Sequence, residues 1–140
     1  MTFLKAVLNE TLRLFPSVPV DTKEAVEDDV LPNGYKVPKG AWVCYSPWVS
    51  GRAKEYWDHP EEFRPSRWIE TPNKPWVFVP FQGGPRICLG QNMAYIEAKV
   101  LTSMILRQYK VTAVPSHKVT YRRSLTLPSN GIMVYFEPRQ

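Results

Sequence analysis

The residues best suited to carry out chemistry lie in one segment, residues 81–90, with the sequence FQGGPRICLG. Its glycines permit positive φ values and close approach of the backbone, and Pro85 removes freedom beside them. Cys88 comes just before a predicted helix that starts near Gly90, where free N–H groups and the helix dipole favour an anion. The segment therefore predicts a loop that holds a thiolate.

Two neighbours of Cys88 could take part in the same chemistry. Arg86 lies two residues upstream, so an extended approach would place both side chains on one side of the chain. Its guanidinium can then offer two donors to a carboxylate or a phosphate. Phe81 can close over the sulfur and exclude water. The alternative is a buried structural cysteine in a glycine-rich turn, because free cysteine is among the most buried residue types.

The segment fits the pattern Phe-x-x-Gly-x-Arg-x-Cys-x-Gly, whose fixed positions are filled by Phe81, Gly84, Arg86, Cys88 and Gly90. This pattern closely resembles the haem-binding loop of the cytochrome P450 superfamily, the haem-thiolate monooxygenases. The resemblance implies haem b as the cofactor, with Cys88 as the proximal iron ligand. It also implies that Arg86 binds a haem propionate and that Phe81 shields the sulfur. An anionic sulfur would push electron density onto the iron, and backbone N–H groups would tune its potential.

A second pattern lies in the first predicted helix, over residues 2–15. Glu10 and Arg13 are three residues apart and share one face. Such a pair is usually a surface salt bridge worth very little. This helix, however, is apolar almost all the way round and needs burial on most sides. The superfamily resemblance implies a structural triad, in which Arg67 from the segment 63–68 locks the Glu10–Arg13 pair in place.

Three further residues receive roles from the resemblance. Lys23 occupies a place where many superfamily members carry an arginine that binds a propionate. Lysine can serve there as a point charge without being equivalent to arginine, and a free surface lysine is the alternative. The last hairpin of the superfamily reaches into the substrate pocket, which implies that Leu125 and Leu127 are apolar substrate contacts. Ordinary buried strand residues are the alternative for these two.

The helices and strands that we expect around these motifs indicate a mainly α fold with small antiparallel β-sheets. Proline ends the first helix, and turn signals such as Asn33-Gly34 separate short strands. We expect residues 1–140 to form a single partial domain, the C-terminal and proximal part of the cytochrome P450 fold. Its predicted segments are a helix at 2–15, short strands at 18–46, a meander at 47–80, the cysteine loop at 81–90, a proximal helix at 91–108, and C-terminal strands at 111–136 that close with a turn at 128–131.

Packing can be predicted for several side chains within these segments. A strand cysteine and a stripe of apolar residues at helical spacing are typical of a core. Tryptophans in a long irregular segment are typical anchors, because such a segment must be tied down. We therefore expect the following: a buried Cys44; a buried stripe of Met93, Ile96, Val100, Leu101 and Met104; anchoring by Trp57, Trp68 and Trp76; and a solvent-facing Arg52.

Composition excludes several other functions. The net charge is +5, and the 18 lysines and arginines are spread along the chain. That distribution favours an electropositive face that docks an acidic protein, and it predicts no nucleic-acid binding. Cys44 and Cys88 give neither a disulfide framework nor a zinc site. The longest uncharged stretches are too short and too rich in proline or glycine to span a bilayer.

The resemblance implies a monooxygenase that hydroxylates a small apolar substrate with dioxygen. Its electrons would come from an NADPH-dependent flavoprotein reductase. The full-length parent would lie at the cytosolic face of the endoplasmic reticulum membrane, with membrane contact only through a missing N-terminal region. Residues 10–19, with Asp21, Lys23 and Gly51-Arg52, resemble the branch that ω-hydroxylates fatty acids and alkanes.

Two alternatives stay open at this point. Chains of the superfamily are several times longer than this one, and the oxygen-activating residues of the distal half would lie outside it. The 140 residues are therefore also compatible with a truncated, non-catalytic fragment. Superfamily members that isomerise or dehydrate peroxides are the other alternative, because the residues that separate them from monooxygenases lie elsewhere.

Overall fold

The computed structural model describes residues 1–70, 76–122 and 124–140. The long helices are α1 (Thr2–Leu14) and α4 (Gln91–Gln108). Two short helices, α2 (Pro47–Ser50) and α3 (Arg67–Glu70), and a 3-10 turn, η1 (Gly84–Arg86), lie between them. The strands are β1 (Asp21–Glu24), β2 (Asp29–Val30), β3 (Lys36–Val37), β4 (Trp42–Tyr45), β5 (Tyr109–Ala113) and β6 (Val134–Pro138).

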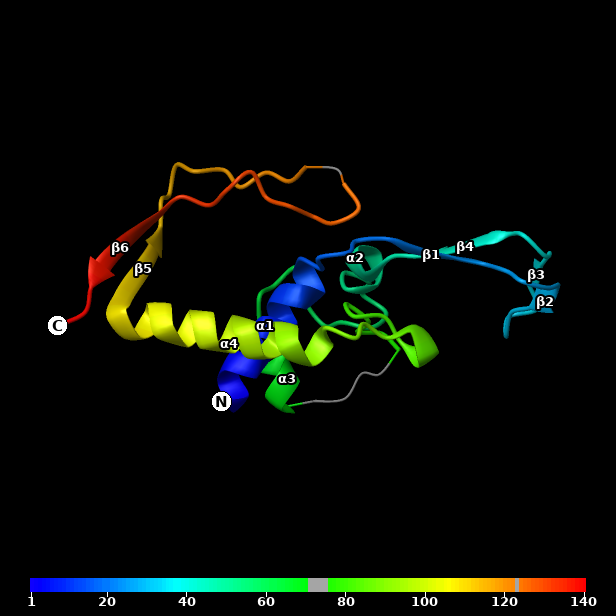
Figure 1. The fold of residues 1–140 in the computed structure, drawn as a ribbon, viewed down its shortest axis with the longest axis horizontal. Helices are drawn as coiled ribbons and strands as arrows, with labels where there is room; N and C mark the ends of the chain where they lie inside the picture. The colour runs from blue at the N-terminus through cyan, green and yellow to red at the C-terminus, as the bar shows by residue number, and fades with distance from the viewer. Residues whose placement is uncertain (71–75, 123) are drawn as a thin grey trace.

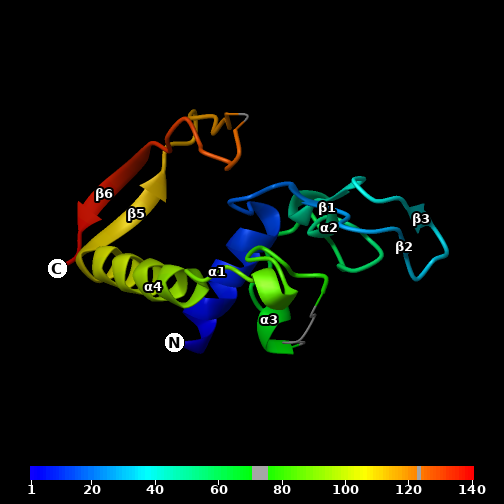
Figure 2. The same cartoon turned by 45° about the vertical axis from the view of Figure 1, so that its right-hand side comes forward.

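Helix α1 is the centre of the arrangement. It contacts α2, α3 and α4, which are not in contact with one another to a comparable extent. Figure 1 shows α4 running along one side of α1, with the β5–β6 hairpin beyond its far end. The β1–β4 and β2–β3 pairs extend from the opposite end of the molecule, and Figure 2 shows the same order from another side. The described chain is thus elongated around one central helix.

The strands form three separate antiparallel pairs. Thr22 of β1 lies opposite Cys44 of β4, and Asp29 of β2 lies opposite Val37 of β3. Between β2 and β3, Gly34 has a φ of 83° and its N–H donates to the Leu31 carbonyl at 2.8 Å. Glycine adopts this left-handed conformation without strain, so the hairpin predicted from Asn33-Gly34 is confirmed.

The C-terminal turn differs from the prediction. Residues 128–131 do not connect two strands, because Ser129 pairs with Tyr121 in an isolated antiparallel bridge. The Asn130 N–H donates to the Thr120 carbonyl at 2.9 Å in the same pairing. The strands β5 and β6 pair further out, with Val111 opposite Phe136. Turn-forming residues therefore lie within an irregular return segment, where their composition cannot distinguish a turn from a bulge.

The buried core is small and aromatic. Ala6, Trp57 and Trp68 form it, with Val77 and Phe78 packed against them. The ring centroids of Trp57 and Trp68 are 5.4 Å apart, and those of Trp68 and Phe78 are 4.4 Å apart. Two of the three predicted tryptophan anchors of the meander are therefore confirmed. The third was wrong, because Trp76 is 77% exposed.

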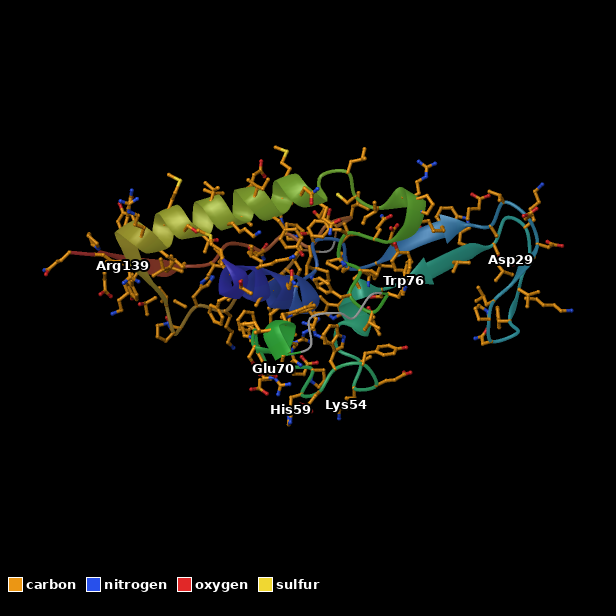
Figure 3. The ribbon with its side chains drawn as sticks, turned by 90° about the horizontal axis from the view of Figure 1, so that it is seen from below. Asp29, Lys54, His59, Glu70, Trp76 and Arg139 are labelled. Atoms are coloured by element: carbon orange, nitrogen blue, oxygen red, sulfur yellow. The ribbon has the colours of Figure 1, made fainter. Side chains whose placement is uncertain are left out.

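Two further packing predictions were wrong because they assumed a neighbour that the described residues do not supply. Cys44 is exposed, since β4 belongs to a two-stranded sheet whose outer face has no cover. The apolar stripe on α4 is exposed as well. The α4 face that is half-buried carries smaller or polar residues, namely Gln91, Ala94, Tyr95, Ala98, Lys99, Thr102 and Ser103. Figure 3 shows α4 along one edge of the molecule, with side chains pointing away from it.

Arg52 also departs from its prediction. Its guanidinium lies 3.6 Å from the ring centroid of Trp48, and its side chain is only 17% exposed. Its Nε is 3.5 Å from a carboxylate oxygen of Glu61. Flat stacking on an aromatic ring is favourable for a guanidinium, which is weakly hydrated. Arg52 therefore joins α2 to the following segment and does not point freely into solvent.

Gly51 lies where α2 meets α1, and we predict that Gly51→Ala destabilises the chain. A Cβ at this position would collide with the backbone carbonyl of Arg13 and lie 2.9 Å from that of Pro47. Backbone atoms cannot yield easily, so we expect a loss of about 1–3 kcal/mol in the free energy of unfolding, measured in urea. The control Val49→Ala changes an exposed residue of the same helix and should stay within about 0.5 kcal/mol. Equal stability of both variants would contradict the contact.

Candidate functional site

The cysteine loop is closed on itself by backbone hydrogen bonds. The Cys88 N–H donates to the Phe81 carbonyl at 2.9 Å, and the Ile87 N–H donates to the Gly84 carbonyl at 3.1 Å. Gly84 has a φ of 73°, which a glycine adopts without strain. The Gln91 N–H donates in turn to the Cys88 carbonyl at 3.2 Å, joining the loop to the first turn of α4. The backbone of Cys88 is therefore fixed on both sides.

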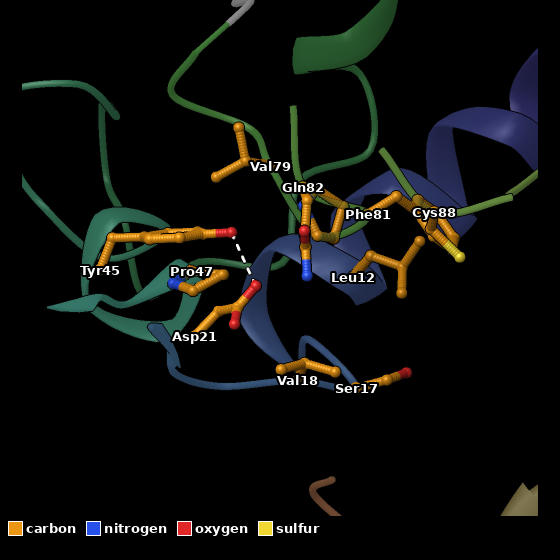
Figure 4. Close-up of a pocket in the computed structure, with 11 residues that line it drawn as sticks. Leu12, Ser17, Val18, Asp21, Tyr45, Pro47, Val79, Phe81, Gln82 and Cys88 are labelled. Atoms are coloured by element: carbon orange, nitrogen blue, oxygen red, sulfur yellow. Dashed lines mark hydrogen bonds between the residues drawn. The ribbon is translucent and has the colours of Figure 1, made fainter. Parts of the chain in front are cut away.

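The Cys88 side chain is exposed, so the alternative of a buried structural cysteine was wrong. It lines a cavity of about 220 Å³ together with Leu12, Val18 and Phe81. Figure 4 shows Cys88 beside Phe81 and Leu12, with Tyr45 and Asp21 on the opposite side of the cavity. Ile87 and Leu89, which flank Cys88 in the sequence, and Met93 in the first turn of α4 are apolar residues that are all exposed. The sulfur is accessible and lies on an apolar surface.

The first turn of α4 leaves donors near the sulfur. Among the described residues, the N–H groups of Leu89 and Gly90 donate no hydrogen bond. A Cβ built on Gly90 would lie 3.8 Å from the Cys88 sulfur, so this backbone passes close to it. Unpaired N–H groups at a helix N-terminus stabilise an anionic ligand. These donors are available to an acceptor beside the loop.

Arg86 belongs to η1 and is exposed. The argument that placed its side chain beside Cys88 assumed an extended approach, and that assumption was wrong because a 3-10 turn occupies residues 84–86. The role of Arg86 as a propionate partner stays a prediction.

Lys23 is connected to the cysteine loop by its side chain. Its ammonium lies 3.2 Å from the Gln82 side-chain oxygen and 3.3 Å from a carboxylate oxygen of Asp21. The Tyr45 hydroxyl donates to the same Asp21 carboxylate at 2.9 Å. These four side chains join the β1–β4 pair to the loop along one edge of the cavity, and sequence reasoning found only Lys23.

The protonation states of Asp21 and Tyr45 follow from the same contacts. Burial by itself would raise the pKa of Asp21, but hydrogen bonds from Tyr45 and Thr22 and the nearby charge of Lys23 outweigh it and lower that pKa. Burial and the hydrogen bond to anionic Asp21 raise the pKa of Tyr45 to about 12. Asp21 is therefore an anion and Tyr45 a neutral donor over the ordinary pH range, with Lys23 as their cation.

The residues of the predicted triad meet in the interior. Glu10, Arg13 and Arg67 are 0%, 1% and 7% exposed. Arg13 donates to both carboxylate oxygens of Glu10 at 2.9 Å, from Nε and Nη2. The Arg67 Nε donates to Glu10 Oε1 at 3.0 Å. Two guanidinium groups from distant parts of the chain thus share one buried carboxylate, and α1 is joined to α3.

Sequence reasoning missed the remaining partners of this carboxylate. The Trp68 indole N–H and the Arg64 backbone N–H donate to Glu10 at 2.9 and 2.8 Å. The guanidinium donors left over bind backbone carbonyls of residues 51, 58–60 and 62. Trp68 follows Arg67 directly, which is a weak signal that it enters the same site. Backbone carbonyls carry no side-chain signature and could not be found.

The pKa of Glu10 reflects this network. Burial alone would raise it, but hydrogen bonds from Arg13, Arg64 and Trp68 and the charge of Arg13 lower it from 4.5 to about 2. The carboxylate therefore stays ionised in the folded chain at all but strongly acidic pH. Charged donors on a buried carboxylate are the strongest hydrogen bonds available to it.

The two candidate substrate contacts differ in position. Leu125 is 82% exposed, whereas Leu127 is half-buried. The Leu127 N–H donates to the Ser17 carbonyl at 2.8 Å, and Ser17 lines the cavity beside Cys88. The return segment from β5 to β6 therefore passes the cavity at Leu127. A role in substrate contact stays a prediction for both leucines.

A chain of helices and small antiparallel sheets that presents an exposed cysteine just before α4, beside a mostly apolar cavity, has the geometry of a site for a thiolate ligand. Residues 1–136 match the family model described as Cytochrome P450. The chain belongs to the cytochrome P450 family, so the predicted family is confirmed. Proteins of this family contain haem b.

Several curated relatives support this assignment. Cytochrome P450 704C1 of Pinus taeda is 44% identical over 99% of this chain. Cytochrome P450 704B1 of Arabidopsis thaliana is 45% identical over 94% of the chain, and cytochrome P450 52A6 of Candida tropicalis is 41% identical over 81%. The chain spans 28%, 26% and 24% of the lengths of these relatives, or about a quarter. In the part of the chain that the structure describes, no helix is long and apolar enough to cross a membrane.

We predict that Glu10→Gln destabilises the fold and alters its response to acid. Because the folded-state pKa of Glu10 is about 2, below the ordinary 4.5, its stabilising contribution is complete above about pH 4.5 and is lost as the pH falls towards 2. Glutamine leaves two guanidinium groups without their anion, which should cost about 3–5 kcal/mol of unfolding free energy at pH 7. Urea denaturation across pH 2–7 measures both effects.

The variant should also lose the part of the acid-induced decline that belongs to Glu10. The exposed Glu70→Gln in α3 is the control, and it should retain both the stability and the acid profile of the original chain. An undiminished decline in Glu10→Gln would show that Glu10 does not carry the acid sensitivity.

Proposed function

We propose that this chain is the C-terminal, proximal part of a cytochrome P450 monooxygenase, a single partial domain in which Cys88 holds the haem iron. One observation carries the proposal. The Cys88 side chain is exposed just before α4, beside a mostly apolar cavity and between the exposed apolar residues Ile87 and Leu89 in the sequence. A flat apolar cofactor needs such a surface around its metal ligand.

The residues near Cys88 fit haem b in three respects. The sulfur is accessible, and the Leu89 and Gly90 N–H groups are available to stabilise a thiolate. Phe81 borders the same cavity and would shield the sulfur from water. Cationic side chains lie on the loop or reach it, which suits the carboxylates of the cofactor. When bound, haem b supplies the redox-active iron, and Cys88 supplies the electron-rich ligand.

Lys23 and Arg86 are each proposed to bind a haem propionate. The Lys23 side chain is 51% exposed although it contacts Asp21 and Gln82. An ammonium group has three donors, so Lys23 can keep these contacts and still donate a hydrogen bond to a carboxylate that approaches from solvent. Arg86 is exposed and offers a bidentate fork. Gly84 and Gly90 are proposed to give the loop its close approach to the cofactor.

The network of Glu10, Arg13 and Arg67 is proposed to be structural. It fastens the irregular segment before the loop to α1, and α1 supplies Leu12 to the wall of the cavity. The carboxylate has no access to solvent and all its partners are donors, which leaves it no free position for a substrate.

The substrate and partners are proposed from the resemblance. A long-chain fatty acid or alkane is the proposed substrate, hydroxylated with dioxygen, and Leu125 and Leu127 are the proposed apolar contacts. An NADPH-dependent flavoprotein reductase would supply electrons, and the net charge of +5 suits docking to an acidic partner. The parent protein is proposed to lie on the cytosolic face of the endoplasmic reticulum membrane.

A second candidate is favoured by the exposed apolar side of α4. Met93, Ile96 and Leu101 are each more than half exposed, and no described residue covers them. Exposed apolar patches mark contact surfaces or aggregation-prone sites. On this alternative the 140 residues are a truncated, non-catalytic fragment that does not hold haem alone.

Haem titration of the purified chain decides between these candidates. We predict stoichiometric binding, and a strongly red-shifted absorption band when the reduced protein binds carbon monoxide. Cys88→Ala should abolish that band because it removes the thiolate. Cys44→Ala is the matched control, since Cys44 is the other exposed cysteine and is not among the residues that line the cavity. An unchanged band in Cys88→Ala would reject the ligand assignment, and no binding at all would support the fragment alternative.

The substrate proposal needs a protein with the full length of the relatives. We predict that such a parent, supplied with a flavoprotein reductase and NADPH, hydroxylates a long-chain fatty acid near its terminal methyl group. Product analysis by mass spectrometry measures the position of the hydroxyl group. Turnover of ring-containing substrates alone would contradict this proposal and leave the haem assignment untouched.

A further inference from the structure

Tyr95 is the one aromatic residue of α4, and it lies seven residues after Cys88. It belongs to the half-buried face of the helix that packs towards α1. Its hydroxyl donates to the side-chain oxygen of Asn9 in α1 at 2.7 Å. Burial raises the pKa of Tyr95, so the hydroxyl remains a donor.

The ring of Tyr95 reaches the cysteine loop. Its centroid is 5.3 Å from that of Phe81, with an angle of 50° between the planes. Phe81 in turn accepts, through its carbonyl, the N–H of Cys88 at 2.9 Å. Two contacts therefore connect the Tyr95 hydroxyl to the backbone of Cys88, one between rings and one between backbone groups.

The other end of this connection is rigid. Asn9 precedes Glu10, whose buried carboxylate receives donors from Arg13, Arg67, Trp68 and the backbone of Arg64. A helix fastened by so many charged and neutral hydrogen bonds is a fixed reference for whatever it contacts.

Among the described residues, few other side-chain hydrogen bonds join α4 to the N-terminal region. The small residues Ala94 and Ala98 border a second cavity of about 240 Å³ between the helices, together with Leu8, Thr11, Leu12, Ser17, Phe81 and Tyr95. Between described residues, the other side-chain hydrogen bond from α4 to the N-terminal region joins Ser103 to the sulfur of Met1 at 3.7 Å. A thioether is a weak acceptor, so the bond from Tyr95 to Asn9 is the stronger restraint.

We infer that Tyr95 is a positioning residue for the cysteine loop: its hydroxyl, held by Asn9, fixes the ring against which Phe81 packs and thereby orients Cys88. The consequence for an iron ligand rests on the proposed function, whereas the contacts themselves do not.

The test uses the cofactor-free chain and Tyr95→Phe, which removes only the hydroxyl group. The Cys88 amide reports directly, because its N–H is bonded to Phe81. Loss of one neutral hydrogen bond should speed its hydrogen exchange roughly fivefold in NMR measurements. The Arg64 amide, bonded to Glu10, is the internal reference and should not change. Tyr135→Phe, at an exposed tyrosine of β6, is the control variant. Unchanged exchange at Cys88, or equal acceleration at Arg64, would overturn the inference.

Variants of Asn9 provide the second measurement. Asn9→Asp keeps an acceptor for the Tyr95 hydroxyl and should retain the protection of the Cys88 amide. Asn9→Leu removes the acceptor and should match Tyr95→Phe, and the double variant should add nothing further, because both changes delete the same bond. Additive effects of the two single changes would contradict a shared hydrogen bond and overturn the inference.

A haem-loaded sample separates this inference from the proposed function. If the original chain binds haem with the red-shifted carbon monoxide band, Tyr95→Phe should lower the fraction of protein that shows it. If the chain binds no haem but Cys88 exchange still responds to Tyr95→Phe, the proposed function fails and the positioning role stands. If the band and the exchange are both unchanged in Tyr95→Phe, the positioning role fails and the proposed function stands.

Discussion

The structure depends on one buried carboxylate. Glu10 receives two guanidinium groups, an indole N–H and a backbone N–H in an interior with no access to water. Removing the carboxylate would leave two guanidinium groups without their anion in a low-dielectric site, which is far costlier than losing a surface ion pair. The excess donors of Arg13 and Arg67 bind carbonyls between residues 51 and 62. Residues 51–62 form no strand, so the guanidinium groups satisfy backbone acceptors that regular secondary structure would otherwise satisfy.

The position of the cysteine follows from that carboxylate through α1. Three two-stranded sheets cannot hold a site in place by themselves, because an isolated strand pair is only marginally stable in water. The β5–β6 pair contacts α4, and the β1–β4 pair is joined to the cysteine loop by the Lys23 contact with Gln82. Helix α1 supplies Leu12 to the cavity that Cys88 lines, and Asn9 to the hydroxyl of Tyr95. The loop at 81–90 is closed by its own backbone bonds, but its orientation depends on a helix that the ionic network has fixed.

The sequence predicts the local features well and their surroundings less well. The Asn33-Gly34 hairpin depends on the φ of one glycine, and the meeting of Glu10, Arg13 and Arg67 follows a motif, so both could be predicted. Periodicity identified an apolar stripe on α4 but not its neighbour, and the helix packs on α1 with smaller and more polar residues. Cys44 and Trp76 were assigned to a core by residue type, although burial depends on what covers a position. The carbonyl partners of Arg13 and the bond from Tyr95 to Asn9 join residues 38 to 86 positions apart, and no local pattern reports such contacts.

The cavity itself is divided by polarity, and this division bears on what it can hold. Asp21, Tyr45 and Gln82 line one part of it, and Leu12, Val18 and Phe81 line another with the exposed sulfur beside them. Lys23 reaches the polar part from β1, where Asp21 already balances its charge. A ligand that matches this division has an apolar body, polar groups on one edge that can accept a hydrogen bond from the half-exposed Lys23 ammonium, and an atom that accepts a thiolate. Haem b has all three properties, whereas a simple fatty acid lacks the last and a bare metal ion lacks the first. The proposed cofactor therefore explains the polar edge and the exposed cysteine together, and neither alone would favour it over a smaller ligand.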